Sequence, residues 1–252
     1  MINELWIILR SLYFWTWTIT ATIFFGIFNN SLILFGAQDW MHHIASFWGK
    51  TLSFVSGTNL IVEGSEKIFR KGPVIILSNH QSMFDIVVIY TFLDIQFRWL
   101  AKASLFRIPV LGWGMRGGGN IPVERGDKRK ALHSLFSAAE EIRAGKSVII
   151  FPEGTRGHED GTMLEFKKGA FILAKKAEVT LQPVTIWGAN KIVPVQKDKW
   201  FQRIYPGTVH IIIHDPISPE AIKNMNTDEL SLHVRKIMEE PMPELRKKLK
   251  LD

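Results

Sequence analysis

A histidine and an aspartate lie five positions apart in SNHQSMFD, residues 78–85. A neutral histidine can take a proton from a reacting hydroxyl, and a neighbouring carboxylate can fix its tautomer and stabilise the imidazolium that forms. His80 and Asp85 are therefore a candidate general base and its orienting partner. A second interpretation is that Ser82 to Asp85 forms a capping box, [ST]-x-x-[DE], in which Asp85 serves only the start of a helix. The two interpretations do not exclude each other.

A second polar cluster follows the β-rich run VIIF. Glu153, Gly154, Thr155 and Arg156 come directly after Pro152. An arginine presented from a glycine turn can hold a phosphate through two hydrogen bonds, whereas a lysine acts as a point charge. The competing interpretation is a surface turn with an ion pair between Glu153 and Arg156.

Four bases lie among five glycines in the next cluster: Lys102, Arg107, Arg116 and Arg125. GWGMRG in this stretch formally matches G-x-G-x-x-G. However, no clear strand leads into it and no acidic residue follows at about 20 positions, so we reject a dinucleotide site. We expect a flexible, basic loop whose backbone can closely approach an anionic group.

The elements that position these residues follow from the alternation of short apolar runs with helical stretches beyond residue 58, which is typical of an α/β sheet. Pro183 lies inside one run, so we expect an edge, a bulge or a strand beginning there, where it would shape a pocket wall. Strands are expected at 60–62, 74–77, 97–101, 120–123, 147–151, 179–186 and 208–213. Helices are expected at 82–93, 128–144, 168–176 and 227–248.

The composition limits the remaining chemistry. The 252 residues suffice for one α/β domain with an appendage, and they include no cysteine, which excludes thiol nucleophiles, disulfides and thiolate metal sites. The net charge is +7, and residues 1–60 hold only two acids and two bases, so the surplus lies in the rest of the chain. A basic body suits nucleic acid, an anionic membrane surface or acidic substrates.

The N-terminal segment favours the membrane. Residues 11–38 carry no charge, and as one helix they would reach about 42 Å, more than the roughly 30 Å hydrocarbon core. Gly26 and the run at 29–31 favour caps and turns, so we expect two helices joined near residue 30. The second, at 31–55, carries an amphipathic stripe. The stripe comprises Trp40, Met41, Ile44, Phe47, Trp48, Leu52 and Val55.

We interpret residues 1–57 as a two-helix monotopic membrane anchor and 58–252 as an α/β domain, since five of the nine tryptophans lie in the first segment. A single span at 12–28 is the rival, but its 17 residues reach only the lower edge of spanning length. A cleaved signal peptide is disfavoured, because no basic region leads the chain. His42 and His43 lack further ligands at metal-site spacing, so we expect interfacial polar residues there and reject a zinc site.

Four motifs occur in order over most of residues 58–190: NHQSMFD, KASLFRIPVLGWGMRGGGNIPVERG, FPEGTR and QPVTI. Together they resemble the glycerolipid acyltransferase superfamily, specifically the 1-acylglycerol-3-phosphate acyltransferases. The resemblance implies that His80 and Asp85 are catalytic. It also implies an α/β fold with a mixed sheet flanked by helices, membrane association, and no cofactor or metal. The residues that it assigns to the acceptor are Lys102, Arg125, Glu153, Gly154, Thr155 and Arg156.

The implied reaction moves a fatty acyl group from a thioester of coenzyme A or acyl carrier protein to the free hydroxyl of lysophosphatidic acid, giving phosphatidic acid for phospholipid biosynthesis. The expected partners are this donor, this acceptor and the lipid bilayer, with no nucleic acid, and the expected location is the cytoplasmic face of the inner membrane. The oxyanion donor stays open among the ammonium of Lys102 and backbone N–H groups near His80 or Gly154. Another acceptor, or a noncatalytic protein that binds anionic lipid, remains an alternative.

Overall fold

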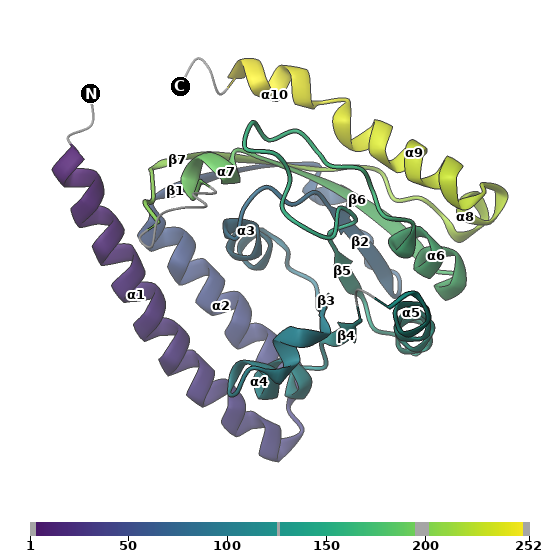
Figure 1. Ribbon diagram of the computed structural model, residues 1–252, viewed down its shortest axis with the longest axis horizontal. Coiled ribbons are helices and arrows are strands. Elements are labelled where there is room, and N and C mark those ends of the chain that lie inside the picture. Colours follow the sequence, from purple (N-terminus) through teal and green to yellow (C-terminus); the bar gives the residue numbers. More distant parts are fainter. Residues whose placement is uncertain (1–3, 125–126, 195–201, 249–252) are drawn as a thin grey trace.

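The computed structural model describes residues 4–124, 127–194 and 202–248. In this part of the chain, two N-terminal helices precede a mixed sheet that has helices on both faces (Figure 1). All seven expected strands are found, with ends that differ by two residues at most. The strands are β1 (Thr58–Glu63), β2 (Val74–Ser78), β3 (Arg98–Lys102), β4 (Ile121–Val123), β5 (Val148–Ile150), β6 (Thr180–Trp187) and β7 (Gly207–Ile213).

The helices connect these strands and cover the sheet. The longer ones are α1 (Glu4–Ser31), α2 (Gln38–Ser56), α3 (Phe84–Phe92), α5 (Lys128–Arg143), α6 (Lys168–Ala177) and α9 (Thr227–Glu239). The shorter ones are α4 (Leu111–Gly117), α7 (Ala189–Ile192), α8 (Pro219–Asn224) and α10 (Met242–Lys248), with 3-10 turns η1 (Leu32–Phe35), η2 (Ser65–Lys67) and η3 (Ala103–Arg107).

The strand order in the described residues is β1-β7-β6-β2-β5-β3-β4. The strands from β6 to β4 run parallel to one another, whereas β7 is antiparallel to β6 and pairs with β1 in parallel. Because β2 lies between β5 and β6, the carboxyl ends of three central strands meet at one edge. Ligands of open α/β sheets bind at this kind of edge.

Two apolar layers hold the sheet between its helices. On one face, α5, α6 and α9 bury side chains such as Ile142, Phe171 and Val234. On the other face, α3 buries Val88, and the N-terminal helices add Phe14 and Leu52 to the same cluster. Every residue of β2, β5 and β6 is buried, as expected for parallel strands covered on both faces.

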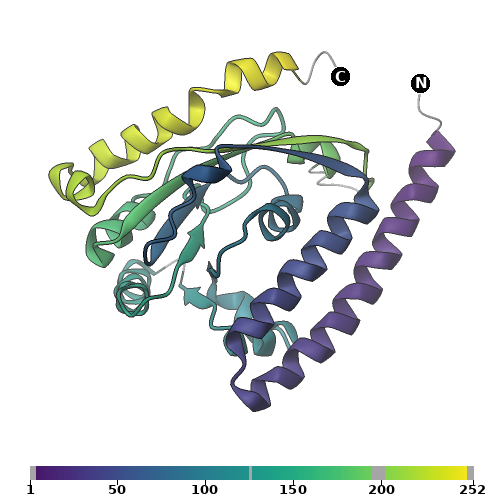
Figure 2. The ribbon, with the colours of Figure 1, turned by 180° about the vertical axis from the view of Figure 1, so that it is seen from behind.

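The N-terminal helices confirm the predicted pair joined near residue 30, although α1 continues through Gly26 and α2 begins only at Gln38. The two helices run side by side, as Figures 1 and 2 both show. Only a narrow stripe of α1 is buried, and most of the rest of the helix is apolar and exposed. Within the described residues, Glu4–Phe35 is the one helical stretch long and apolar enough to cross a membrane.

Two expectations about the loops and helices are wrong. The stretch predicted as a flexible basic loop forms η3 and α4 instead. The single helix expected at 227–248 is two helices, α9 and α10, which are separated at Pro241, because proline cannot donate the hydrogen bond that a continuous helix requires there.

Pro183 does not lie at a sheet edge, because β6 pairs with β2 on one side and with β7 on the other. The β6–β7 ladder covers only Val184–Trp187, and beyond it the carbonyl of Pro183 accepts a hydrogen bond from His214 N. A residue's N–H and C=O point to the same side of a strand, so the missing N–H of Pro183 falls where that ladder has ended. The sheet therefore tolerates proline in an interior strand.

Candidate active site

His80 and Asp85 are in direct contact at the carboxyl edge of β2. The Nδ1 atom of His80 lies 2.8 Å from Oδ2 of Asp85. The same oxygen accepts hydrogen bonds from the backbone N–H groups of Gln81 (2.6 Å) and Ser82 (2.9 Å), and the Asp85 side chain is fully buried. A carboxylate in this position places the imidazole proton on Nδ1. The lone pair is then on Nε2, the atom that a general base needs.

Only one of the two hydrogen bonds of the expected capping box is present. Asp85 returns its carboxylate to the N–H of Ser82, as the acidic member of such a box does. The Ser82 hydroxyl, however, accepts from the N–H of Phe84 and donates to the carbonyl of Val193, so it does not cap Asp85. One carboxylate thus serves both the start of α3 and the ring of His80.

Buried amide side chains hold the backbone on both sides of His80. Asn79 accepts from the N–H of Ile186 and donates to its carbonyl, both at 2.8 Å. Gln81 accepts from the N–H of Gly188 and donates to the carbonyl of Gly161. The sequence motifs alone assign no role to these amides. Their position directly after a fully apolar strand was the available signal, since buried polar groups require partners.

The ring of His80 stacks on Phe151, with centroids 4.0 Å apart and an interplanar angle of 9°. Phe151 contacts Trp99, and Trp99 contacts Tyr90 and donates a hydrogen bond to its hydroxyl at 2.8 Å. Burial raises the pKa of Tyr90 to about 12. Together with the hydrogen bond to Asp85, the stacking contact fixes the plane of the imidazole from two directions.

Glu153 lies inside the protein, with 1% of its surface exposed. One carboxylate oxygen accepts from the backbone N–H of His80 (2.8 Å) and the other from that of Leu164 (2.7 Å). Burial raises the pKa of Glu153, while these two hydrogen bonds act in the opposite direction. Within the described residues no ion pair joins Glu153 to Arg156, so the interpretation as a surface turn with an ion pair is wrong.

The rest of this motif lines a surface hollow of about 730 Å³. Gly154 has a φ of +69°, a conformation that glycine adopts readily, and the chain then turns so that Thr155 and Arg156 reach the hollow. The N–H of Gly157 donates to the carbonyl of His80 at 2.7 Å, which holds this loop against the histidine. Lys102 is exposed at the carboxyl end of β3, the strand beside β5. Arg125 lies outside the described residues.

A second, more apolar cavity of about 600 Å³ lies between α1, α2 and α4. Tyr90 and Phe97 line it, so the ring contacts that begin at His80 continue to its wall. His42 also lines it and is buried against Phe97, which contradicts the expected interfacial position. Burial lowers the pKa of His42 to about 4, and the nearby Arg98 and His43 lower it further. The described residues contain no group of three His, Asp or Glu side chains that could hold a metal ion.

Comparison with known proteins identifies the family. The model of a family described as Acyltransferase matches residues 59–187, which include β1 to β6 and both polar clusters. The chain belongs to the acyltransferase family. A solved structure, the 1-acyl-sn-glycerophosphate (LPA) acyltransferase PlsC from Thermotoga maritima, has the same fold with a TM-score of 0.79 and 29% identity, over 96% of this chain and 98% of that one.

Curated relatives of this acyltransferase-family chain have similar names. A chloroplast 1-acyl-sn-glycerol-3-phosphate acyltransferase of Arabidopsis thaliana is 37% identical over 70% of this chain and 48% of its own length. A protein of the same name from Saccharomyces cerevisiae is 31% identical over 88% of this chain and 73% of its own length. The chain spans about half the length of the plant and algal relatives that it matches.

Proposed function

We propose that the chain is a 1-acylglycerol-3-phosphate acyltransferase, which moves a fatty acyl group from acyl-coenzyme A or acyl carrier protein to the free hydroxyl of lysophosphatidic acid. The observation that carries this proposal is the contact of 2.8 Å between His80 and Asp85 at the carboxyl edge of the central strands. The names of the relatives support the choice of acceptor. The product would be phosphatidic acid, an intermediate of phospholipid biosynthesis.

His80 acts as the general base. In this mechanism, Nε2 takes the proton of the acceptor hydroxyl while the hydroxyl oxygen attacks the thioester carbonyl. The new ester bond forms as the carbon–sulfur bond breaks, and the proton on His80 then passes to the departing thiolate. Proton transfer of this kind contributes about 10²- to 10⁴-fold to a rate. Asp85 keeps the proton on Nδ1 in the resting state and stabilises the imidazolium during transfer.

The developing oxyanion requires hydrogen-bond donors, and several nearby donors are already engaged. The N–H groups of His80, Gln81 and Ser82 bind carboxylate oxygens, and that of Gly154 binds the carbonyl of Phe151. Among the donors expected, we favour the ammonium of Lys102, which is exposed at the carboxyl end of β3. A donor of this type commonly contributes about 10²- to 10³-fold.

Arg156 holds the acceptor phosphate, aided by Arg125. The planar guanidinium can bind two phosphate oxygens at once, which sets the distance of the acceptor hydroxyl from His80. Gly154 and Thr155 shape the turn that presents Arg156. Glu153 contributes indirectly, because its two hydrogen bonds hold the backbone of His80 against the loop at 161–164.

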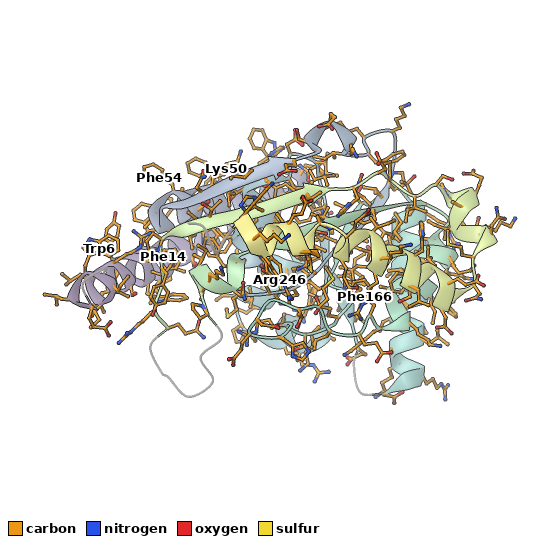
Figure 3. The ribbon with its side chains drawn as sticks, turned by 90° about the horizontal axis from the view of Figure 1, so that it is seen from above. Trp6, Phe14, Lys50, Phe54, Phe166 and Arg246 are labelled. Carbon is orange, nitrogen blue, oxygen red and sulfur yellow. The ribbon has the colours of Figure 1, made fainter. Side chains whose placement is uncertain are left out.

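Residues 1–57 anchor residues 58–252, the acyltransferase domain, to the bilayer. Figure 3 shows Trp6 and Phe54 at the end of the molecule formed by α1 and α2, away from Phe166 and Arg246. Trp6 and Phe54 are exposed, and exposed apolar residues continue along α1 to Phe35. A pair of helices with exposed apolar side chains can lie in one membrane surface. The lipid acceptor would reach the site there, and soluble donors would approach from the cytoplasmic side of the inner membrane.

Acyl transfer from oleoyl-coenzyme A to lysophosphatidic acid in detergent micelles tests the function. The parent should form phosphatidic acid, and His80→Ala should be slower by about 10²- to 10⁴-fold. His233→Ala, at an exposed histidine of α9, is the matched control and should keep the parental rate. A parental rate in folded His80→Ala would refute the mechanism. A parent that binds anionic vesicles yet transfers no acyl group from either carrier to any lysophospholipid would favour a lipid-binding protein.

A further inference from the structure

The segment formed by η3 and α4, residues 103–117, exposes a group of apolar side chains that the proposed mechanism does not use. A monomeric soluble protein rarely exposes a large contiguous apolar patch unless the patch meets a partner or a membrane. Trp113 has 58% of its surface exposed and does not line the apolar cavity, so it points away from it. The exposed apolar side chains here are Leu105, Ile108, Val110, Leu111 and Trp113.

The backbone at the tip of this segment is strained. Val110 has a φ of +64° and a ψ of −56°, and the N–H of Leu111 donates to the carbonyl of Pro109 at 2.7 Å. These values describe a γ-turn of the rare, strained type, here at a β-branched residue. Strained backbone of this kind clusters at functional sites. The turn leaves Val110 half exposed at the junction of η3 and α4.

The exposed apolar face continues onto the N-terminal helices. The side-chain amide of Asn30 donates to the carbonyl of Val110, and Gly117 has no side chain where Ile33 packs against it. Leu34, in η1, is 85% exposed, and Phe35 beside it is 78% exposed. Figures 1 and 2 both show α4 beside the end of α1 that leads into η1. The two exposed faces therefore form one surface.

The charges of the segment suit an anionic membrane surface. Between Lys102 and Val123 the sequence holds three bases and no acid. Arg107 and Arg116 are exposed, and the ion pair of Arg107 with Glu124 is long, at 3.5 Å. Basic side chains beside exposed apolar and tryptophan residues are typical of elements that lie at the headgroup level of anionic lipid.

We propose that residues 103–117 are a second membrane-binding surface, which enters the lipid beside α1 and η1. The proposal rests on the proposed anchor, with which it shares one leaflet. Val110, Leu111 and Gly114 also line the apolar cavity, together with Gly26 and Ile27 of α1. The seam between α1 and α4 therefore faces lipid, and only this seam separates the cavity from the leaflet.

Single-cysteine labelling tests the surface directly, because the natural sequence has no cysteine. Trp113→Cys, Leu34→Cys and Leu232→Cys, each labelled with the environment-sensitive fluorophore NBD, are mixed with vesicles of phosphatidylcholine and phosphatidylglycerol that carry a spin-labelled quenching lipid. Leu34 represents the anchor, and Leu232, 68% exposed on α9, represents apolar surface elsewhere. We expect a blue shift and quenching at positions 113 and 34, and neither at position 232.

Quenching at position 34 without quenching at position 113 would overturn the second surface and leave the anchor intact. That result would also be obtained if a second copy of the chain covered Trp113. Quenching at neither position would overturn both the surface and the anchor. Acyl transfer by the same labelled proteins in detergent measures the catalytic proposal separately, so its failure can be told apart from failure of the surface.

A charge variant tests how much Trp113 contributes to membrane binding. Trp113→Glu should reduce the vesicle partition coefficient by about tenfold, because a large apolar side chain no longer enters lipid. Leu232→Glu should leave it unchanged, and both variants should keep the parental rate on substrates dispersed in detergent. Vesicle binding by folded Trp113→Glu that equals the parental value would contradict the proposal.

Discussion

The carboxyl edge of the central strands and the N-terminal helical pair are stabilised in different ways. At the strand edge, Asp85 Oδ2 meets three donors, and each oxygen of Glu153 meets one. Along α1 and η1, by contrast, few side-chain hydrogen bonds reach the body, and large apolar side chains remain exposed. The first region is held by buried hydrogen bonds, whose loss would leave unpaired polar groups inside the protein. The second is a surface whose stability depends on what covers it.

The two regions touch through a small set of contacts. Arg98, at the start of β3, binds Asp39 of α2 at 3.0 Å, and Gly49 of α2 allows close approach to Tyr90. A Cβ at position 49 would lie 2.6 Å from that of Tyr90. The ring contacts from Tyr90 to His80 then connect the helical pair with the strand edge. Substitutions in one region should therefore show whether the other region depends on it.

The largest effect is expected at the strand edge. Asp85→Asn should lower kcat by about 10³- to 10⁴-fold, because an amide can donate to Nδ1 and so favours the wrong tautomer of His80. Steady-state acyl transfer in detergent measures this effect, with thermal unfolding as the check on folding. Asp94→Asn, which removes only an exposed ion pair with Arg70, is the control. Equal rates for the two folded variants would mean that Asp85 acts only as a cap.

A smaller effect is expected on the surface that we propose to face lipid. The double variant Leu34→Glu with Phe35→Glu should bind vesicles about 100-fold more weakly, since two apolar side chains lose their burial in lipid. Its rate on detergent-dispersed substrate should stay parental. Sedimentation with vesicles and the micelle assay give the two readouts. A parallel loss of activity in micelles would show that the two regions are not separable.

Arg156→Lys should raise KM for lysophosphatidic acid by about tenfold, with a smaller change in kcat, because a point charge replaces a bidentate contact. Arg70→Lys, at an exposed arginine that precedes the amino end of β2 and pairs with Asp94, is the matched control. Initial rates over a range of acceptor concentrations separate the two constants. An unchanged KM would remove Arg156 from the acceptor site.

The smallest effect concerns the pH dependence of the free energy of unfolding. His42 has a folded pKa of about 4 against an ordinary value of 6.5, so the unfolded chain binds more protons between these values. The contribution of His42 to the free energy of unfolding is therefore fully present above pH 6.5. It falls as the pH falls toward 4, and the loss is about 1 to 2 kcal/mol near pH 5. Chemical denaturation at pH 7 and pH 5 should show a smaller loss for His42→Phe. The loss of stability that remains in this variant includes the contribution of His214. Burial lowers the pKa of His214 to about 4 as well.

The regular elements were predictable because apolar periodicity is a local property of the sequence. Each strand was recognised from its own run, and the polar residues that followed β2 and β5 marked the candidate site. The contacts of Glu153 were not predictable, since its partner Leu164 lies in a loop without a recognisable pattern. The helix α4 was missed because five glycines suggested a loop, whereas Gly112 and Gly117 are needed where Phe106 and Ile33 approach closely.

The pairing of β1 with β7 has a consequence for the order of events during synthesis. β1 directly follows α2, yet its partner in the described sheet is β7, about 150 residues later. The first strand therefore stays without this partner until about 150 further residues have been synthesised. An exposed edge at that stage is prone to wrong association. Early capture of the preceding helices by a bilayer would hold each nascent chain apart from its neighbours until the last strand arrives.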